Sequence, residues 1–237
     1  SSLDANTTGS ANTSVGQASL TANTTGLNNT SVGKGSLAAN TTGSGLVAVG
    51  KSALAASTTA SYNVGVGDSA LGQTTTGFGN TSIGNTAGYS VTTGDNNTCI
   101  GKNSGRSDSP FEVSSQDNRL VLGNNSITHS YVKVDWTVTS DERDKMNFGE
   151  VPHGLSFVND LQPVKFDFKK SRDNATPHGK TKYGFKAQDI LALEGDSPII
   201  IDNENEDSLK VTNSHLIPVL VKAIQELSAK VEALENA

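Results

Sequence analysis

The sequence predicts a mainly β protein, in which a parallel β-solenoid or β-roll is followed by an α+β domain that ends in a short coiled-coil helix. Three observations predict it: a repeat of fixed period, a change in composition around residue 140, and a heptad pattern at the end. Residues 1–105 hold 18 of the 24 glycines and only six charged residues, which cancel, so the net charge of -6 lies in residues 106–237. We therefore expect two parts that fold differently.

The first part repeats every 17 residues. A glycine that follows Val or Ile recurs with this period, and a second glycine column keeps the same step except at Ala60. The first column consists of Gly16, Gly33, Gly50, Gly67, Gly84 and Gly101. A fixed period with columns of like residues is typical of a solenoid. The abundance of Thr, Val, Asn and Gly favours strands and turns over helices, and we expect two short strands and two turns per coil over residues 1–105.

Each coil offers little apolar surface, usually one Val or Ile, one Leu and some Ala. A single chain would leave its sheets poorly covered, so we expect a homo-oligomer whose copies pack around a shared axis. Stacked Asn and Thr side chains can add ladders of hydrogen bonds. A disordered linker is the alternative, but disorder requires no strict period. Asn-Thr-Ser and Asn-Thr-Thr triplets match glycosylation acceptors, although turn residues of a repeating coil explain them.

Residues 106–139 are expected to form a β-rich connector. It contains two apolar runs, Leu120–Gly123 and Tyr131–Val138, and the second alternates as a half-buried strand would. Residues 140–237 are expected to form the α+β domain. Its predicted elements are strands at Lys165–Lys169, Pro198–Ile201 and Ser208–Val211, and a helix at Ala187–Leu193.

A helix over residues 216–236 closes the chain. Apolar residues alternate steps of three and four, with β-branched residues at a and Leu at d: Ile217, Leu220, Ile224, Leu227, Val231 and Leu234. Glu226 and Lys230 are expected to pair on its exposed side. A coiled coil of about three heptads is marginal alone, so this helix should assist an assembly and not drive it.

Composition excludes several functions. Neither part has a basic stripe, which argues against nucleic acid and anionic membranes as partners, and no apolar run has transmembrane length. Cys99 is alone, and the four histidines show no metal-ligand spacing, so we expect no disulfide, metal or cofactor. Paired glycosidase carboxylates and a Walker lysine are missing too. Because the chain begins with Ser1 and not Met, we expect it to be a fragment.

A candidate dyad lies where the composition changes. Ser140 and Lys145 are five residues apart, a hydroxyl nucleophile and an amine that could act as its base. A lysine serves as a base only if burial or neighbouring cations lower its pKa. The bond to be cut would be Thr139–Ser140. On this hexapeptide alone, the favoured alternative is that Ser140 caps a turn and Lys145 is a surface cation.

Several spaced motifs favour cleavage, because together they resemble a known family. They are Thr139-Ser140-Asp141-x-Arg143-x-Lys145, Leu161-x-Pro163-Val164-x-Phe166, Tyr183-Gly184-Phe185-x-Ala187-Gln188-Asp189, Leu216-x-Pro218 and Ala223-Ile224-x-Glu226-Leu227. From about residue 130 to 237 the chain resembles the C-terminal intramolecular chaperone and auto-processing domain of bacteriophage tail fibres and tailspikes, of the endosialidase type. The resemblance implies a homotrimer, a β-helical product, and release of the chaperone by cleavage before Ser140, with Asp141 and Arg143 in supporting roles.

The 17-residue repeat also resembles the heads of trimeric adhesins and the shafts of phage fibres. The combined resemblance implies a virion tail fibre that is made and folded in the host cytoplasm and binds a bacterial cell-surface receptor, either a glycan or an outer-membrane protein. Two alternatives stay open: a trimeric adhesin or structural fibre with a non-cleaving trimerisation cap, and a piece of a tailspike whose saccharide-degrading domain lies upstream.

Overall fold

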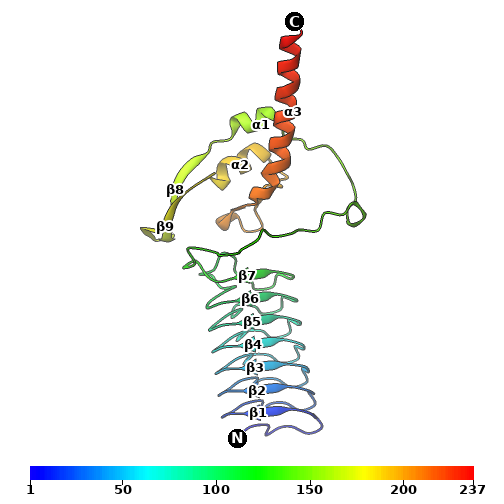
Figure 1. Ribbon diagram of the computed structural model, residues 1–237. Helices are drawn as coiled ribbons and strands as arrows, with labels where there is room; N and C mark the ends of the chain where they lie inside the picture. Colours follow the sequence, from blue (N-terminus) through cyan, green and yellow to red (C-terminus); the bar gives the residue numbers. More distant parts are fainter. The chain divides into compact units, whose positions relative to one another are not determined.

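The computed structural model describes residues 1–237, which form two compact units, Ser1–His129 and Ser130–Ala237. The first is the predicted solenoid, and Figure 1 shows its strands stacked in one column. Seven three-residue strands form a parallel sheet in chain order. They are β1 (Thr13–Val15), β2 (Thr30–Val32), β3 (Val47–Val49), β4 (Val64–Val66), β5 (Thr81–Ile83), β6 (Thr98–Ile100) and β7 (Leu120–Leu122). The parallel β-solenoid is thereby confirmed.

The strands pair in a constant register. Thr13 lies beside Thr30 and Thr81 beside Thr98, so the 17-residue period of the sequence is the length of one coil. The last coil is longer, because Thr98 pairs with Leu120 across 22 residues. The sheet therefore runs on through β7, within the residues expected to form the connector.

Each coil has one strand, so the prediction of two was wrong. The leucine column lies in turns, and its residues adopt the left-handed region of φ, with values of 48° to 55° at Leu3, Leu20, Leu37, Leu54 and Leu71. A non-glycine residue is disfavoured in this region by contacts of its Cβ atom. The burial of each leucine side chain offsets that cost, because Leu20, Leu37, Leu54 and Leu71 are fully buried.

The hydrophobic core of the solenoid is formed by residues of one chain. The buried leucines meet the middle residue of each strand, among them Ala48, Cys99 and Val121. The residues on either side of that middle position point outward, and Val15 and Leu120 are 57% and 60% exposed. The expectation of a poorly covered sheet thus holds for the outer face alone, since the inner face has its own core.

Polar ladders hold successive coils together, as expected. The Asn40 side-chain amide donates to Asn23 Oδ1 (2.9 Å), and that of Asn23 donates to Asn6 Oδ1 (2.7 Å). A second ladder links Asn97 Nδ2 to Asn80 Oδ1 (3.1 Å). Buried amides are costly unless they are paired, and a repeating coil pairs each one with its counterpart one coil away.

The second unit has mixed structure. Its elements are η1 (Glu142–Asp144), α1 (Leu155–Asp160), the antiparallel pair β8 (Val164–Ser171) and β9 (Asn174–Gly184), α2 (Ala187–Glu194), β10 (Ile201–Asp202), η2 (Glu206–Ser208), β11 (Lys210–Val211), η3 (Asn213–His215) and α3 (Leu216–Glu235). The predicted helices and the strand at Lys165–Lys169 are confirmed, while the strands predicted at Pro198–Ile201 and Ser208–Val211 are shorter. No helix is long and apolar enough to span a bilayer.

A small core holds this unit together. Phe157 of α1, Ile190 of α2 and Val219 of α3 are buried in one cluster with Ile200 and Ile201. The Glu194 carboxylate accepts the backbone N–H groups of Ile199, Ile200 and Ile201 at 2.8–3.0 Å, which fixes the chain leading into β10. The apolar residues beside β10 are therefore held in place by a polar contact.

The strand predicted at Tyr131–Val138 does not form. These residues lack regular secondary structure, and Tyr131, Val134, Trp136 and Val138 are 72–88% exposed. A half-buried strand needs a neighbour that covers its apolar side and pairs its backbone. None of the three sheets of the chain includes these residues.

Candidate functional site

The candidate dyad is brought together by a short turn. Lys145 Nζ donates a hydrogen bond to Ser140 Oγ across 2.7 Å. The helical turn η1 lies between them, and the backbone N–H of Lys145 closes it by donating to the Glu142 carbonyl at 3.1 Å. The two atoms lie within the distance that a nucleophile and its base require, although a base accepts the serine proton and here Nζ is the donor.

Asp141 and Arg143 shape this turn. Asp141 is the N-cap of η1, where its carboxylate accepts the Arg143 backbone N–H at 2.9 Å. Asp and Asn suit that position because their side chains reach an N–H that the turn leaves unpaired. The Arg143 side chain also donates hydrogen bonds to both carboxylate oxygens of Asp141, from Nε at 3.0 Å and from Nη2 at 2.6 Å. Both residues therefore support the turn that carries the dyad.

The ion pair also changes the titration of its partners. Hydrogen bonds from the Arg143 side chain and backbone lower the pKa of Asp141, and the same contact raises the pKa of Arg143. Both side chains are open to solvent, where such pairs add little to stability. Their contribution is to geometry, because the pair holds the residue after Ser140 and the residue two before Lys145.

The side chains of Ser140 and Lys145 lie within hydrogen-bond distance, but neither of them is buried. Every residue from Ser140 to Lys145 is exposed. In water a lysine amine is protonated near neutral pH and cannot accept a proton from serine, so a Ser-Lys pair works only where burial or neighbouring cations favour the neutral amine. What the single chain lacks is a cover over the turn.

Apolar residues on both sides of the dyad lack a cover too. Trp136 and Val138 precede it and are 72% and 77% exposed; Met146 and Phe148 follow it and are 79% and 68% exposed. The bond between Thr139 and Ser140 lies in the same exposed stretch.

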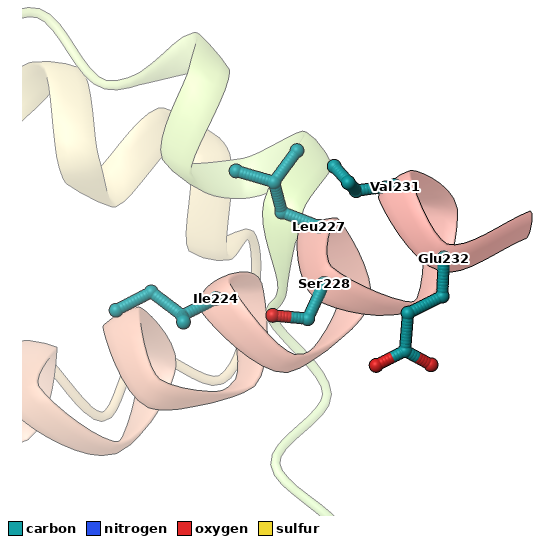
Figure 2. A pocket seen from close by; sticks show the side chains of 5 residues that line it. All are labelled: Ile224, Leu227, Ser228, Val231 and Glu232. Carbon is teal, nitrogen blue, oxygen red and sulfur yellow. The ribbon is translucent and has the colours of Figure 1, made fainter. Parts of the chain in front are cut away.

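A second exposed apolar surface runs along α3. The six heptad residues are 44–78% exposed: Ile217, Leu220, Ile224, Leu227, Val231 and Leu234. A shallow hollow lies on this stripe, lined by Ile224, Leu227, Ser228, Val231 and Glu232, and Figure 2 shows the apolar side chains projecting from successive turns of the helix. The predicted helix is present, and its apolar heptad residues are exposed in the single chain.

The opposite face of α3 packs on its own unit. Val219 and Ala223 are buried, and the Glu226 carboxylate accepts the backbone N–H of Leu155 at 2.8 Å, at the start of α1. The prediction that Glu226 pairs with Lys230 on an exposed side is thus wrong. A Cβ atom on Gly154 would lie 2.3 Å from Glu226 Oε1, so the glycine makes room for this cap. The signal in the sequence was a glycine before a short helix without a capping side chain of its own.

Other reactive groups do not form a competing site. Cys99 lies in the solenoid core, where burial raises the pKa of its thiol to about 11, so it is neither charged nor accessible at neutral pH. His153 stacks on Phe157 with ring centroids 4.2 Å apart, and His215 Nδ1 lies 2.8 Å from the Ile199 carbonyl. No group of His, Cys, Asp and Glu has an arrangement that could hold a metal ion.

Comparison with known proteins points to the region that contains the candidate dyad. Residues 140–195 match the peptidase S74 family, described as chaperone of endosialidase, and the matched segment begins at Ser140. No curated protein and no solved structure matches the chain. The resemblance to an endosialidase-type chaperone domain is therefore confirmed over these residues. The chain thus combines a β-solenoid with a segment, residues 140–195, that is similar to a family described as chaperone of endosialidase.

Proposed function

We propose that this chain is the C-terminal part of a phage tail fibre, whose residues 140–237 assemble three copies, support the folding of the solenoid, and are then released by self-cleavage between Thr139 and Ser140. The observation that carries the proposal is the 2.7 Å contact between Ser140 Oγ and Lys145 Nζ at the first residues of the family match. Asp141 and Arg143 keep that turn in shape.

The cleavage follows from the chemistry of the two side chains. Neutral Lys145 takes the proton of the Ser140 hydroxyl, and Oγ attacks the carbonyl carbon of Thr139. The new C–O bond replaces the C–N bond, and the amine of Ser140 leaves with the proton. Water then hydrolyses the ester, which frees the carboxylate of Thr139 and restores the Ser140 hydroxyl. The reaction is a single turnover and needs no cofactor.

Assembly supplies what the site lacks. Three copies that met through the exposed stripe of α3 would bring three sets of uncovered residues around Trp136 and Met146 together. Covering these residues would desolvate Lys145 and lower its pKa, which is the condition for general-base catalysis. Cleavage therefore waits for the trimer. After it, the reverse route is closed, and the fibre is held by kinetics as well as by equilibrium.

The chaperone has a specific task in this fold. Because successive coils carry similar residues in each column, a coil could pair out of turn and still satisfy most of its contacts. A domain that trimerises first fixes the end of the solenoid and raises the local concentration of the three chains. The released fibre would remain in the virion and bind a bacterial surface receptor, a glycan or an outer-membrane protein.

The exposure of Ser140 and Lys145 favours one other candidate function. In a trimeric adhesin or structural fibre with a non-cleaving cap, the turn could stay open to water, and residues 140–237 would serve for assembly alone. The two functions differ only in whether the chain splits.

Intact mass of the expressed full chain distinguishes them. We expect two fragments from the wild type, residues 1–139 and 140–237, and one intact chain from Ser140→Ala. Ser130→Ala, which changes an exposed serine in the same unit, should be cut as the wild type is. A wild-type trimer that stays intact would overturn self-cleavage and leave the non-cleaving cap.

A further inference from the structure

The outer face of the seven-stranded sheet carries a continuous apolar stripe. The third residue of every strand points outward and is Val, Ile or Leu: Val15, Val32, Val49, Val66, Ile83, Ile100 and Leu122. Val49 is 37% exposed, Ile83 44% and Leu122 52%. The first residue of each strand, which faces the same way, is Thr, Val or Leu. A patch of this kind along a whole element marks an interaction site.

We propose that this face is the surface on which further copies of the same chain pack, with the three sheets turned toward a common axis. The inference rests on the proposed homotrimer and names its interface in the solenoid. It adds to the contact through α3, which lies in the other unit.

The regular spacing of the stripe identifies the occupant. Its seven apolar residues recur at the height of one coil each, because the strands pair in register through all seven coils. A surface with the same repeat matches such a stripe at every level, and another copy of this solenoid has that repeat. Each coil contributes too little apolar area to hold a partner alone, whereas seven coils in register add their contributions.

The turns at the two ends of the strands carry opposite charges. The turn after the strands holds Lys34, Lys51 and Lys102, with Asp68 as an exception, while the turn before them holds Asp95 and Asp117. When three sheets face one axis, the turns that follow the strands of one copy meet the turns that precede the strands of the next copy. Asp95 and Lys102 flank the same strand, β6, so they would meet at one level between neighbouring copies. Lys102 makes no ion pair within its own chain.

Polar residues keep the rest of the coil in water. The exposed threonines Thr25, Thr42, Thr59, Thr76 and Thr93 recur at one position of the repeat outside the strands. This column offers a matched control, because Thr42 lies in the same coil as Val49 but on a different side of it.

Cross-linking of the full chain tests the interface. In a Cys99→Ser background, Val49→Cys and Thr42→Cys each add one thiol at a position that is exposed in the single chain. Serine suits position 99 because Ser14, Ser31 and Ser82 occupy the same column of the sheet. With a short bifunctional thiol reagent, Val49→Cys should give covalent dimers on a denaturing gel at least ~10-fold more efficiently than Thr42→Cys. Sedimentation of both variants gives the oligomeric state in parallel.

The outcomes separate this inference from the proposed function. Trimers in which Val49→Cys fails to cross-link, or in which Thr42→Cys does so equally well, would overturn the interface and leave the homotrimer standing. Monomers would overturn both. Charge reversal tests the proposed contact between strand ends. Lys102→Glu would face Asp95 of the neighbouring copy, whereas Lys51→Glu would face Ser44 of that copy. Lys102→Glu should therefore lower the denaturant midpoint of trimer dissociation more than Lys51→Glu. Equal shifts would contradict the proposed contact between strand ends of neighbouring copies.

Discussion

In the solenoid, leucines and amides are buried and paired within one chain, whereas in residues 130–237 the residues that carry the proposed chemistry lie open to water. Leu54 and Asn80 are fully buried, and each has partners one coil away. Ser140 and Lys145 touch each other but have no cover. The comparison teaches that the first unit takes its stability from repetition, while the second leaves the residues of its proposed site uncovered within the single chain.

The largest expected effect is on cleavage and tests the second half of that comparison. Lys145→Met should reduce the rate of cleavage by at least ~100-fold, since it removes the base. Lys145→Arg is the matched variant, because arginine keeps the charge and the hydrogen bond but stays protonated. Intact mass over time measures both. Normal cleavage of Lys145→Arg would show that the side chain acts through its charge and not as a base.

Loss of assembly should follow from a change on the heptad stripe. Leu227→Asp places a carboxylate at a d position, where burial in a three-helix seam would be costly, so we expect monomers that are not cleaved. Gln225→Asp makes the same change on an exposed position outside the stripe and should leave the trimer intact. Sedimentation and intact mass read the two effects. A cleaved monomer of Leu227→Asp would break the link between assembly and chemistry.

A core substitution tests the first half. Leu54→Ala should lower the free energy of unfolding of the solenoid by about 2–5 kcal/mol, because it leaves a cavity between coils. Thr42→Ala, at an exposed position, should change it by less than about 0.5 kcal/mol. Chemical denaturation followed by circular dichroism measures both. Equal effects would mean that the solenoid does not depend on the core within its own chain.

The smallest effect sharpens the account of the ladders. The Asn column that links Asn6, Asn23 and Asn40 ends at Ser57, and the buried Asn40 Oδ1 has no partner. In the same coil Ala60 replaces a glycine. A Cβ atom at the equivalent Gly43 would lie 2.5 Å from Asn40 Oδ1, so asparagine at 57 and alanine at 60 should exclude each other.

The double variant Ser57→Asn/Ala60→Gly should therefore extend the ladder and raise the free energy of unfolding by about 1 kcal/mol. Ser57→Asn alone should lower it, because the new amide meets the Ala60 methyl group. Denaturation of the two variants and of Ala60→Gly completes the cycle. Simple additivity would show that the two positions are not coupled.

Much of the fold follows from the sequence, since a 17-residue period with columns of Gly, Val and Leu predicts a solenoid and a heptad predicts α3. The number of strands per coil does not, because Leu37 and Leu54 occupy the left-handed region that their residue type disfavours. Only their burial in neighbouring coils explains that conformation. The interruption at Ala60 is likewise explained by the 2.5 Å that would separate a Cβ atom at the equivalent Gly43 from Asn40 Oδ1.

The site shows the same limits. Its sequence places Ser140 near Lys145, and the Asp141–Arg143 contact that shapes the turn is local, so both could be anticipated from six residues. The strand expected at Tyr131–Val138 could not be settled in this way, because alternation indicates which side chains want cover but not what covers them. Glu226 was misplaced because a helix position four residues from a lysine says nothing of α1, which comes 71 residues earlier at Leu155.

The dependence of cleavage on chain concentration tests the central claim most directly. Wild-type chain made by cell-free synthesis over a range of final concentrations should release residues 140–237 faster as concentration rises, because the dyad acts only after copies have met. The fragment should appear after the trimer in samples analysed for mass and oligomeric state together. A rate that does not change with concentration, with cleaved monomers present, would contradict the claim that assembly completes the site.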